Sequence, residues 1–289
     1  MDSYFLRAMH IGPQNVIPIS LERHTDHVRA RQCLIDAGDF ERRYELLLGN
    51  FLAFEDFCAY WQLRSNVETD HSYERWAGVI LEAGRHILNV LASGRTYVDQ
   101  VVRDFKLFGS EGEFNGRARE LMSTAYDLSK DYRLVNELRN RAQHRALPVD
   151  GMESNNRPSA AEAQTMMFYC DKAKISTDRG GFKKRVLDEA DDKIDLRAVL
   201  RGYMTQMGGI HIALRTLVNT ECGRSRAIVA AAIEEYSAAQ NDGRTSSSGI
   251  GVASVITRDG ILAEPVPLLL NWDDTRVKLA EKNRSPVKF

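Results

Sequence analysis

The strongest constraint on the fold is a helical repeat of apolar side chains in the first quarter of the chain. Between Phe40 and Arg64, large apolar residues recur at steps of three and four, the spacing that lines one face of an α-helix. The members of this stripe are Tyr44, Leu47, Leu48, Phe51, Phe54, Cys58 and Trp61. Because a stripe of this width must be covered by other parts of the chain, we expect it to lie in the core of a helical protein.

The same repeat predicts helices through most of the sequence. Gly38 is expected to end the first of them, and Pro148 must end the helix that begins near Asp131. Residues 20–38 can open a helix, and the six further expected helices cover residues 40–64, 72–108, 114–129, 131–147, 194–222 and 224–240. A strand is expected within 165–176, and residues 251–270 predict two strands joined at the turn Arg258-Asp259-Gly260. The predicted fold class is therefore an all-α bundle of about six helices with a small C-terminal β-hairpin.

Three segments follow from this pattern. Residues 1–19, with Gly12, Pro13 and Pro18, predict an extended N-terminal arm. Residues 20–240 form the helical domain. Residues 241–289 comprise a flexible link, the hairpin and a charged tail after Trp272 that is expected to be poorly ordered.

Composition narrows the function classes. The chain has 289 residues and a formal net charge of −1, so any nucleic-acid site must be a local basic patch. No apolar run is long enough for a membrane span and no secretory signal is evident, which predicts a cytoplasmic protein with no membrane partner. Cys33, Cys58, Cys170 and Cys222 include no Cys-x-x-Cys pair, so we expect buried free thiols and no metal site.

One segment, residues 131–149, combines the residue types needed for phosphate chemistry. Four arginines at 133, 139, 141 and 145 accompany Asn140, Gln143 and His144. Histidine moves protons near neutral pH, and the forked guanidinium of arginine binds phosphoryl oxygens. Such a pair can activate a ribose 2′-hydroxyl and stabilise the charge that develops on the phosphorane.

Arg139, the polar Asn140 beside it, and His144 resemble the signature of HEPN domains, in which four to six residues separate an arginine from a histidine. The following Arg-Ala-Leu-Pro-Val is similar to the continuation in some bacterial members. The resemblance implies an all-α bundle and a metal-independent ribonuclease of a toxin–antitoxin, antiphage or RNA-processing system, with no cofactor. It also implies catalytic roles for Arg139, Asn140 and His144, and a homodimer in which two motifs face one cleft.

The remaining basic and amide side chains of the segment suggest how RNA would be held. We expect Arg133, Arg141, Gln143 and Arg145 to bind RNA, and an antitoxin or another protein to be a further partner. On a regular helix, residues five apart project about 140° from each other. Arg139 and His144 therefore reach one phosphate only if the helix unwinds before Pro148 or a second protomer supplies the complementary group.

Two alternatives stay open. Arg139, Asn140 and His144 can simply complete a helix end, where cationic side chains interact favourably with the helix dipole by about 0.3–1 kcal/mol. The protein would then be a non-catalytic helical scaffold that binds RNA or a protein partner.

Other polar residues carry weaker signals. His24 and His27 are three residues apart but have no third metal ligand at matching spacing, so they are expected to be surface residues. Glu55 and Asp56 are expected on a solvated helix face.

Overall fold

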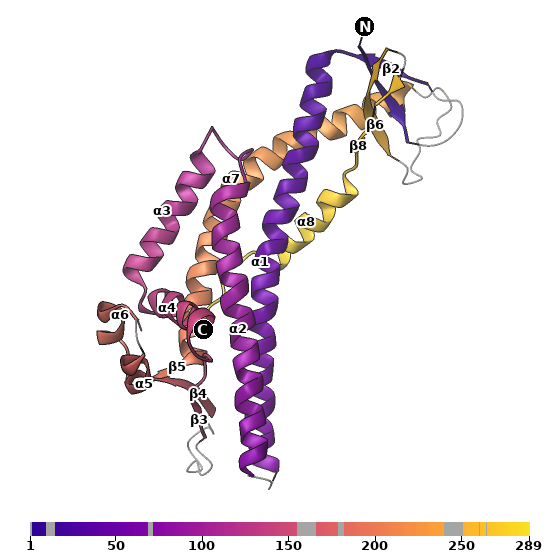
Figure 1. The fold of residues 1–289 in the computed structure, drawn as a ribbon. Coiled ribbons are helices and arrows are strands. Elements are labelled where there is room, and N and C mark those ends of the chain that lie inside the picture. The colour runs from indigo at the N-terminus through magenta and orange to yellow at the C-terminus, as the bar shows by residue number, and fades with distance from the viewer. Residues whose placement is uncertain are drawn as a thin grey trace. The chain divides into compact units, whose positions relative to one another are not determined.

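The structure is a computed structural model in which helices dominate and a few short strands form small antiparallel sheets (Figure 1). It describes residues 2–9, 15–68, 72–154, 166–178, 182–239, 251–259, 261–263 and 265–289. The chain divides into two compact units: unit 1 comprises Met1–Arg42, Phe105–Asn115 and Leu214–Arg284, and unit 2 comprises Arg43–Asp104, Gly116–Ala213 and Ser285–Phe289. The expected helical class is confirmed at this level.

Two helices are longer than the sequence predicted. Helix α1 (Leu21–Val67) runs through Gly38, and helix α7 (Leu196–Ala239) joins the two segments expected at 194–222 and 224–240. A glycine inside a helix costs only about 1 kcal/mol relative to alanine, and no proline follows Gly38 to stop the helix. The predicted end at Gly38 is therefore wrong, because packing along α1 outweighs a small local preference.

Unit 2 is built on a hairpin of long helices. From Arg43 onward, α1 lies antiparallel to α2 (Tyr73–Asp104), with Arg43 Nη1 3.0 Å from Asp104 Oδ2 at one end and Trp61 against Trp76 at the other (Figure 1). The predicted stripe of α1 is buried from Tyr44 to Cys58, and Trp61 is half-buried. Helices α3 (Glu113–Leu128) and α4 (Lys130–His144) follow.

Close packing in unit 2 explains Gly94, which does not interrupt α2. A Cβ at this position would lie 2.6 Å from the hydroxyl oxygen of Tyr203 on α7, a buried side chain that is 3% exposed. Nearby, buried His211 stacks on Tyr44 with ring centroids 4.1 Å apart and its Nδ1 lies 2.8 Å from the Tyr97 hydroxyl. Glycine is thus required here because the side chain of Tyr203 on α7 approaches the backbone of α2 closely.

A three-stranded antiparallel sheet follows α4 in unit 2, with the order β3 (Gly151–Ser154), β4 (Met166–Asp171), β5 (Lys193–Asp195). The strand expected within 165–176 is confirmed in its first half. Its second half is helix α5 (Lys172–Thr177), because the Asp171 carboxylate accepts a hydrogen bond from the Ala173 N–H at 2.8 Å and caps a helix. Helix α6 (Lys184–Asp188) lies before β5.

Unit 1 contains a five-stranded antiparallel sheet that joins the two ends of the sequence. Strand β1 (Ser3–Ala8) lies between β2 (Ile17–Ile19) and β6 (Val252–Arg258), and β6 also pairs with β7 (Ile261–Leu262) and β8 (Val266–Leu268). The register places Phe5 opposite Val255. The predicted C-terminal hairpin is present as β6–β7, and the N-terminal arm forms strands of the same sheet. Residues 10–14 of the arm and 241–250 of the expected flexible link lie outside the described residues.

The charged tail forms helix α8 (Asn271–Lys282), so the expected poor order after Trp272 is wrong. Its charges have partners inside unit 1. Asp273 is 2% exposed and accepts hydrogen bonds from Arg276 and Arg226. Arg276 belongs to α8 itself, whereas Arg226 of α7 pairs with both Asp273 and Asp274. This distant partner, which the local sequence pattern does not indicate, helps to order the charged segment.

Two further expectations about polar residues are corrected. His27 is buried, not at the surface, and its Nδ1 lies 3.1 Å from the Ser254 hydroxyl of β6, while His24 Nδ1 lies 2.9 Å from the same oxygen. Glu55 does not face solvent alone, because its carboxylate accepts hydrogen bonds from Arg197 and Arg201 of α7. In each case a long-range partner replaces water.

The expectation of buried free thiols is confirmed, since all four cysteines are buried and free. Across the described residues, no helix is both long and apolar enough to span a membrane.

Candidate functional site

The predicted catalytic residues lie on the last two turns of α4. The helix begins after Ser129, whose hydroxyl accepts a hydrogen bond from the Tyr132 N–H at 3.1 Å. It ends at His144, where the Arg145 N–H still donates to the Arg141 carbonyl at 2.9 Å. The helix is therefore intact through both ends of the Arg139–His144 motif.

One face of α4 is buried and the other faces solvent. The buried face comprises Tyr132, Arg133, Leu134, Val135, Glu137, Leu138 and Arg141. Asn140, Gln143 and His144 are exposed, and Arg139 is half-buried between the two faces. The helical spacing of the apolar residues thus fixes which polar side chains of the motif can meet a ligand.

Arg139 and Asn140 form a hydrogen-bonded pair on α4. Arg139 Nη1 donates to Asn140 Oδ1 at 3.0 Å, and His144 lies one helical turn beyond Asn140 on the same face. Among the described residues, the buried Nε of Arg139 has no hydrogen-bond partner. A buried donor left in this state costs about 1–3 kcal/mol.

The helical geometry separates the two ionisable groups of the motif. Because α4 does not unwind before His144, Arg139 and His144 leave the helix axis about 140° apart. The first of the two ways to bring them to one phosphate, local unwinding of the helix, is not observed. A single copy of α4 thus presents an imidazole with an amide, and turns the guanidinium away from that imidazole.

Arg133 has its donors occupied inside unit 2. It is 7% exposed and donates to the Glu189 carboxylate at 2.6 Å and 3.1 Å. Its Nη1 also donates to the carbonyls of Tyr126 and Asp127, at 2.8 Å each. These carbonyls belong to the last turn of α3. Arg133, which was predicted to bind RNA, therefore caps α3 and joins it to α4.

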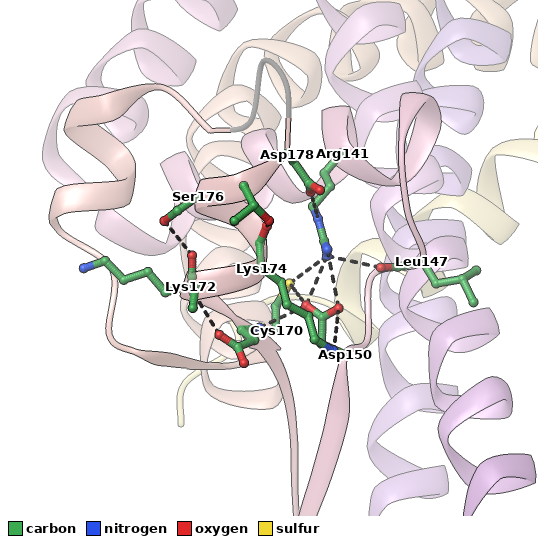
Figure 2. Close-up of polar contacts among 11 residues, drawn as sticks. Arg141, Leu147, Asp150, Cys170, Lys172, Lys174, Ser176 and Asp178 are labelled. Atoms are coloured by element: carbon green, nitrogen blue, oxygen red, sulfur yellow. Dashed lines mark hydrogen bonds and ion pairs between the residues drawn. The ribbon is translucent and has the colours of Figure 1, made fainter.

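Arg141 is the centre of a second internal network (Figure 2). The side chain is 4% exposed, and its Nε donates to Asp178 Oδ2 at 2.9 Å. Its two terminal nitrogens lie 3.3 Å and 3.4 Å from the oxygens of Asp150, and Nη1 also donates to the Leu147 carbonyl at 3.3 Å. Figure 2 shows the guanidinium between Asp178 and Asp150, so this arginine ties the end of α4 to the loop before β3 and to the end of α5.

Asp150 is held as an anion in this network. Burial opposes its ionisation, but hydrogen bonds from the Asp171 N–H and the Cys170 thiol, together with Arg141, lower the pKa of the Asp150 carboxyl. Burial and the bond to Asp150 raise the pKa of the Cys170 thiol. Cys170 therefore remains a protonated donor to the carboxylate and is not a nucleophile.

The four side chains that were predicted to bind RNA thus fall into two groups, buried and exposed. Arg133 and Arg141 are engaged in internal ion pairs, whereas Gln143 and Arg145 are exposed. Helical spacing carried a signal for this division, because Arg141 lies three residues after Leu138 and seven after Leu134, both buried. Asp150 and Asp178 were missed, since nothing local connects them to α4.

Comparison with protein-family models, with curated proteins and with solved structures finds no match to this chain.

Proposed function

We propose that the protein is a metal-independent endoribonuclease of the HEPN kind. In this proposal His144 moves the proton, Arg139 binds the scissile phosphate, and Asn140 orients Arg139. The observation that carries the proposal is the exposed imidazole of His144, one turn from an Asn140 amide that holds the Arg139 guanidinium at 3.0 Å.

The chemistry requires no group beyond these side chains. The ribose 2′-oxygen attacks the adjacent phosphorus, the imidazole accepts its proton, and the guanidinium stabilises the charge on the phosphorane oxygens. The bond to the 5′-oxygen breaks, and that oxygen takes the proton from the imidazolium, which returns the imidazole to its starting state. The products are a 2′,3′-cyclic phosphate and a 5′-hydroxyl, and the reaction consumes neither water nor a metal ion.

Two copies of the chain would form the working site. Because one α4 directs Arg139 and His144 about 140° apart, the phosphate-binding arginine of one copy is expected to act with the histidine of the other. Exposed Gln143 and Arg145 would contact the RNA backbone beside the composite cleft. Arg133 and Arg141 are positioning residues, which hold α4 and its catalytic side chains in place.

Cleavage of total RNA in excess EDTA tests the activity. His144→Ala and Arg139→Ala should each lower the rate by at least about 10²-fold, the usual contribution of a proton-transfer or charge-stabilising group. Arg103→Ala, which removes an exposed arginine of α2, is the matched control and should leave the rate unchanged. Fragments with 5′-hydroxyl ends are expected. Equal cleavage by wild type and both variants would reveal a contaminating nuclease and contradict the proposal.

A mixed dimer tests the composite site. When Arg139→Ala and His144→Ala chains carry different tags and are purified through both, one site has neither side chain and the other has both. The mixed dimer should then show about half the wild-type rate, although each variant alone is inactive. The shared site would be refuted if no mixed dimer can be isolated, or if the isolated mixed dimer is inactive.

Growth provides a separate test. Expression of the wild-type chain alone should arrest growth if the protein is a toxin, and co-expression of an antitoxin partner should relieve the arrest. A folded wild-type protein that cleaves no RNA at high concentration would favour the non-catalytic scaffold.

A further inference from the structure

A cavity of ≈ 180 Å³ lies within unit 1, far along the sequence from α4. It is partly open to solvent and is lined by α1, α7, strand β8 with the residue that follows it, and the first turn of α8. Its apolar lining consists of Leu34, Ile35, Val229, Pro267, Leu269 and the ring of Trp272. A cavity of about 150 Å³ accepts one benzene ring, so this one can hold a body of that size.

Arg31 distinguishes this cavity from an ordinary packing defect. It lines the cavity from α1, and the centre of its guanidinium lies 5.9 Å from the ring centroid of Trp272. Within the described part of the chain, its guanidinium has no carboxylate partner, and its buried Nε has no hydrogen-bond acceptor. Other arginines of unit 1 differ, since Arg23 pairs with Glu235 and Arg42 with Asp39.

The acidic group at the cavity does not compensate Arg31. Asp273 lines the cavity, but its carboxylate is already bound by Arg276 and Arg226. Burial opposes the ionisation of Asp273, and these two hydrogen-bonded arginines nevertheless lower its pKa. Arg42 also lines the cavity, but it is paired with Asp39. Among the described residues that line the cavity, Arg31 is therefore the charged side chain that has no ion-pair partner.

The first turn of α8 lies at the same cavity as the positive charge of Arg31. Leu270 occupies the N-cap position and provides no side-chain hydrogen bond to the helix. The amino end of a helix carries a partial positive charge, and the adjacent Leu269 and Trp272 line the cavity. Asp273 and Asp274 also lie in this first turn, but both accept hydrogen bonds from Arg226. An apolar body and a negatively charged end are therefore both accommodated.

We propose that this cavity binds a small carboxylate whose apolar body is about the size of one ring. The ring lies among Ile35, Val229 and Leu269, and the carboxylate is bound by Arg31 beside the face of Trp272. A charge-assisted hydrogen bond to an otherwise unpartnered guanidinium gives the site its preference for an anion over a neutral ligand of equal shape.

Phenylacetate is a suitable probe, with phenylacetamide as its neutral counterpart of nearly equal shape. Ligand-observed NMR titration of the full chain should give a dissociation constant of about 0.1–1 mM for phenylacetate, typical of a fragment with so few atoms. Phenylacetamide should bind at least about tenfold more weakly, because it lacks the charge that Arg31 recognises.

Three variants test the assignment. Arg31→Leu should weaken phenylacetate at least about tenfold, whereas Arg29→Leu, an exposed arginine on the same helix, should not change it. Ile35→Phe should fill the cavity and remove binding of both ligands, and thermal unfolding should show that each variant is folded.

The assignment is overturned if phenylacetate does not bind at concentrations of about 10 mM. It is equally overturned if the amide binds as well as the acid, or if Arg31→Leu binds like wild type. None of these results bears on the proposed RNA cleavage, since the cavity and α4 belong to different units.

Discussion

Replacement of Arg141 by methionine should destabilise unit 2, because the buried Asp150 carboxylate keeps only the distant charge of Lys174, whose exposed Nζ lies 3.8 Å away. Methionine retains much of the length of the arginine side chain but donates no hydrogen bond. Asp150, whose side chain is 11% exposed, would lose its guanidinium partner, and Asp178 would lose a 2.9 Å hydrogen bond. We expect the free energy of unfolding of unit 2 to fall markedly.

The magnitude follows from the geometry. Removal of one member of a buried ion pair costs about 3–5 kcal/mol. The long contacts to Asp150, at 3.3 Å and 3.4 Å, and the 27% exposure of Asp178 place the expected cost near the lower limit, about 3 kcal/mol. For a chain of this size, such a loss lowers the melting temperature by about 6–12 °C.

Urea unfolding followed by circular dichroism measures this loss. Amide hydrogen exchange over residues 130–154 localises it to α4 and the following strand, because the two units can unfold separately. Arg145→Met, an exposed arginine on the same helix end, is the matched control and should cost less than about 0.5 kcal/mol. Adding Asp150→Asn to Arg141→Met should recover part of the stability.

Two results would refute this reasoning. Equal destabilisation by Arg141→Met and Arg145→Met would show that the network does not stabilise the helix end. A double variant no more stable than Arg141→Met would show that the cost does not arise from the loss of the guanidinium beside the Asp150 carboxylate.

Two further predictions concern packing and pH. Gly94→Ala should lower the free energy of unfolding by about 1–3 kcal/mol, because the new methyl would meet the buried Tyr203 hydroxyl at 2.6 Å. Gly78→Ala on the same helix meets nothing within 4 Å and should raise the free energy of unfolding by up to about 1 kcal/mol. Denaturant unfolding measures both variants, and equal effects would contradict the packing argument. Burial, with the charges of Arg23 and His24, lowers the pKa of His27, so the folded state disfavours its protonation and the stability present above about pH 6.5 should fall as the pH falls toward 5. His27→Gln should flatten this part of the stability curve, and an unchanged slope would assign it to other groups.

The helices were predictable because their determinants are local. Each helical hydrogen bond joins residues four apart, so the apolar stripe from Tyr44 to Cys58 identifies both a helix and its buried face. The same rule predicted the divergence of Arg139 and His144 on an intact α4. It failed at Gly38 and after Trp272, where packing and distant ion pairs outweighed local preference.

The sequence by itself determined a mainly helical protein, the helix that carries Arg139, Asn140 and His144, and the faces to which they belong. Only the tertiary structure decided that Arg141 is bound by Asp150 and Asp178, that the first strand pairs with β6, and that Arg31 lines a cavity without a carboxylate partner among the described residues. The physical reason is the separation along the sequence of the residues that interact. Periodicity reports neighbours three or four residues apart, whereas a counter-charge or a strand partner depends on how the whole chain folds back on itself.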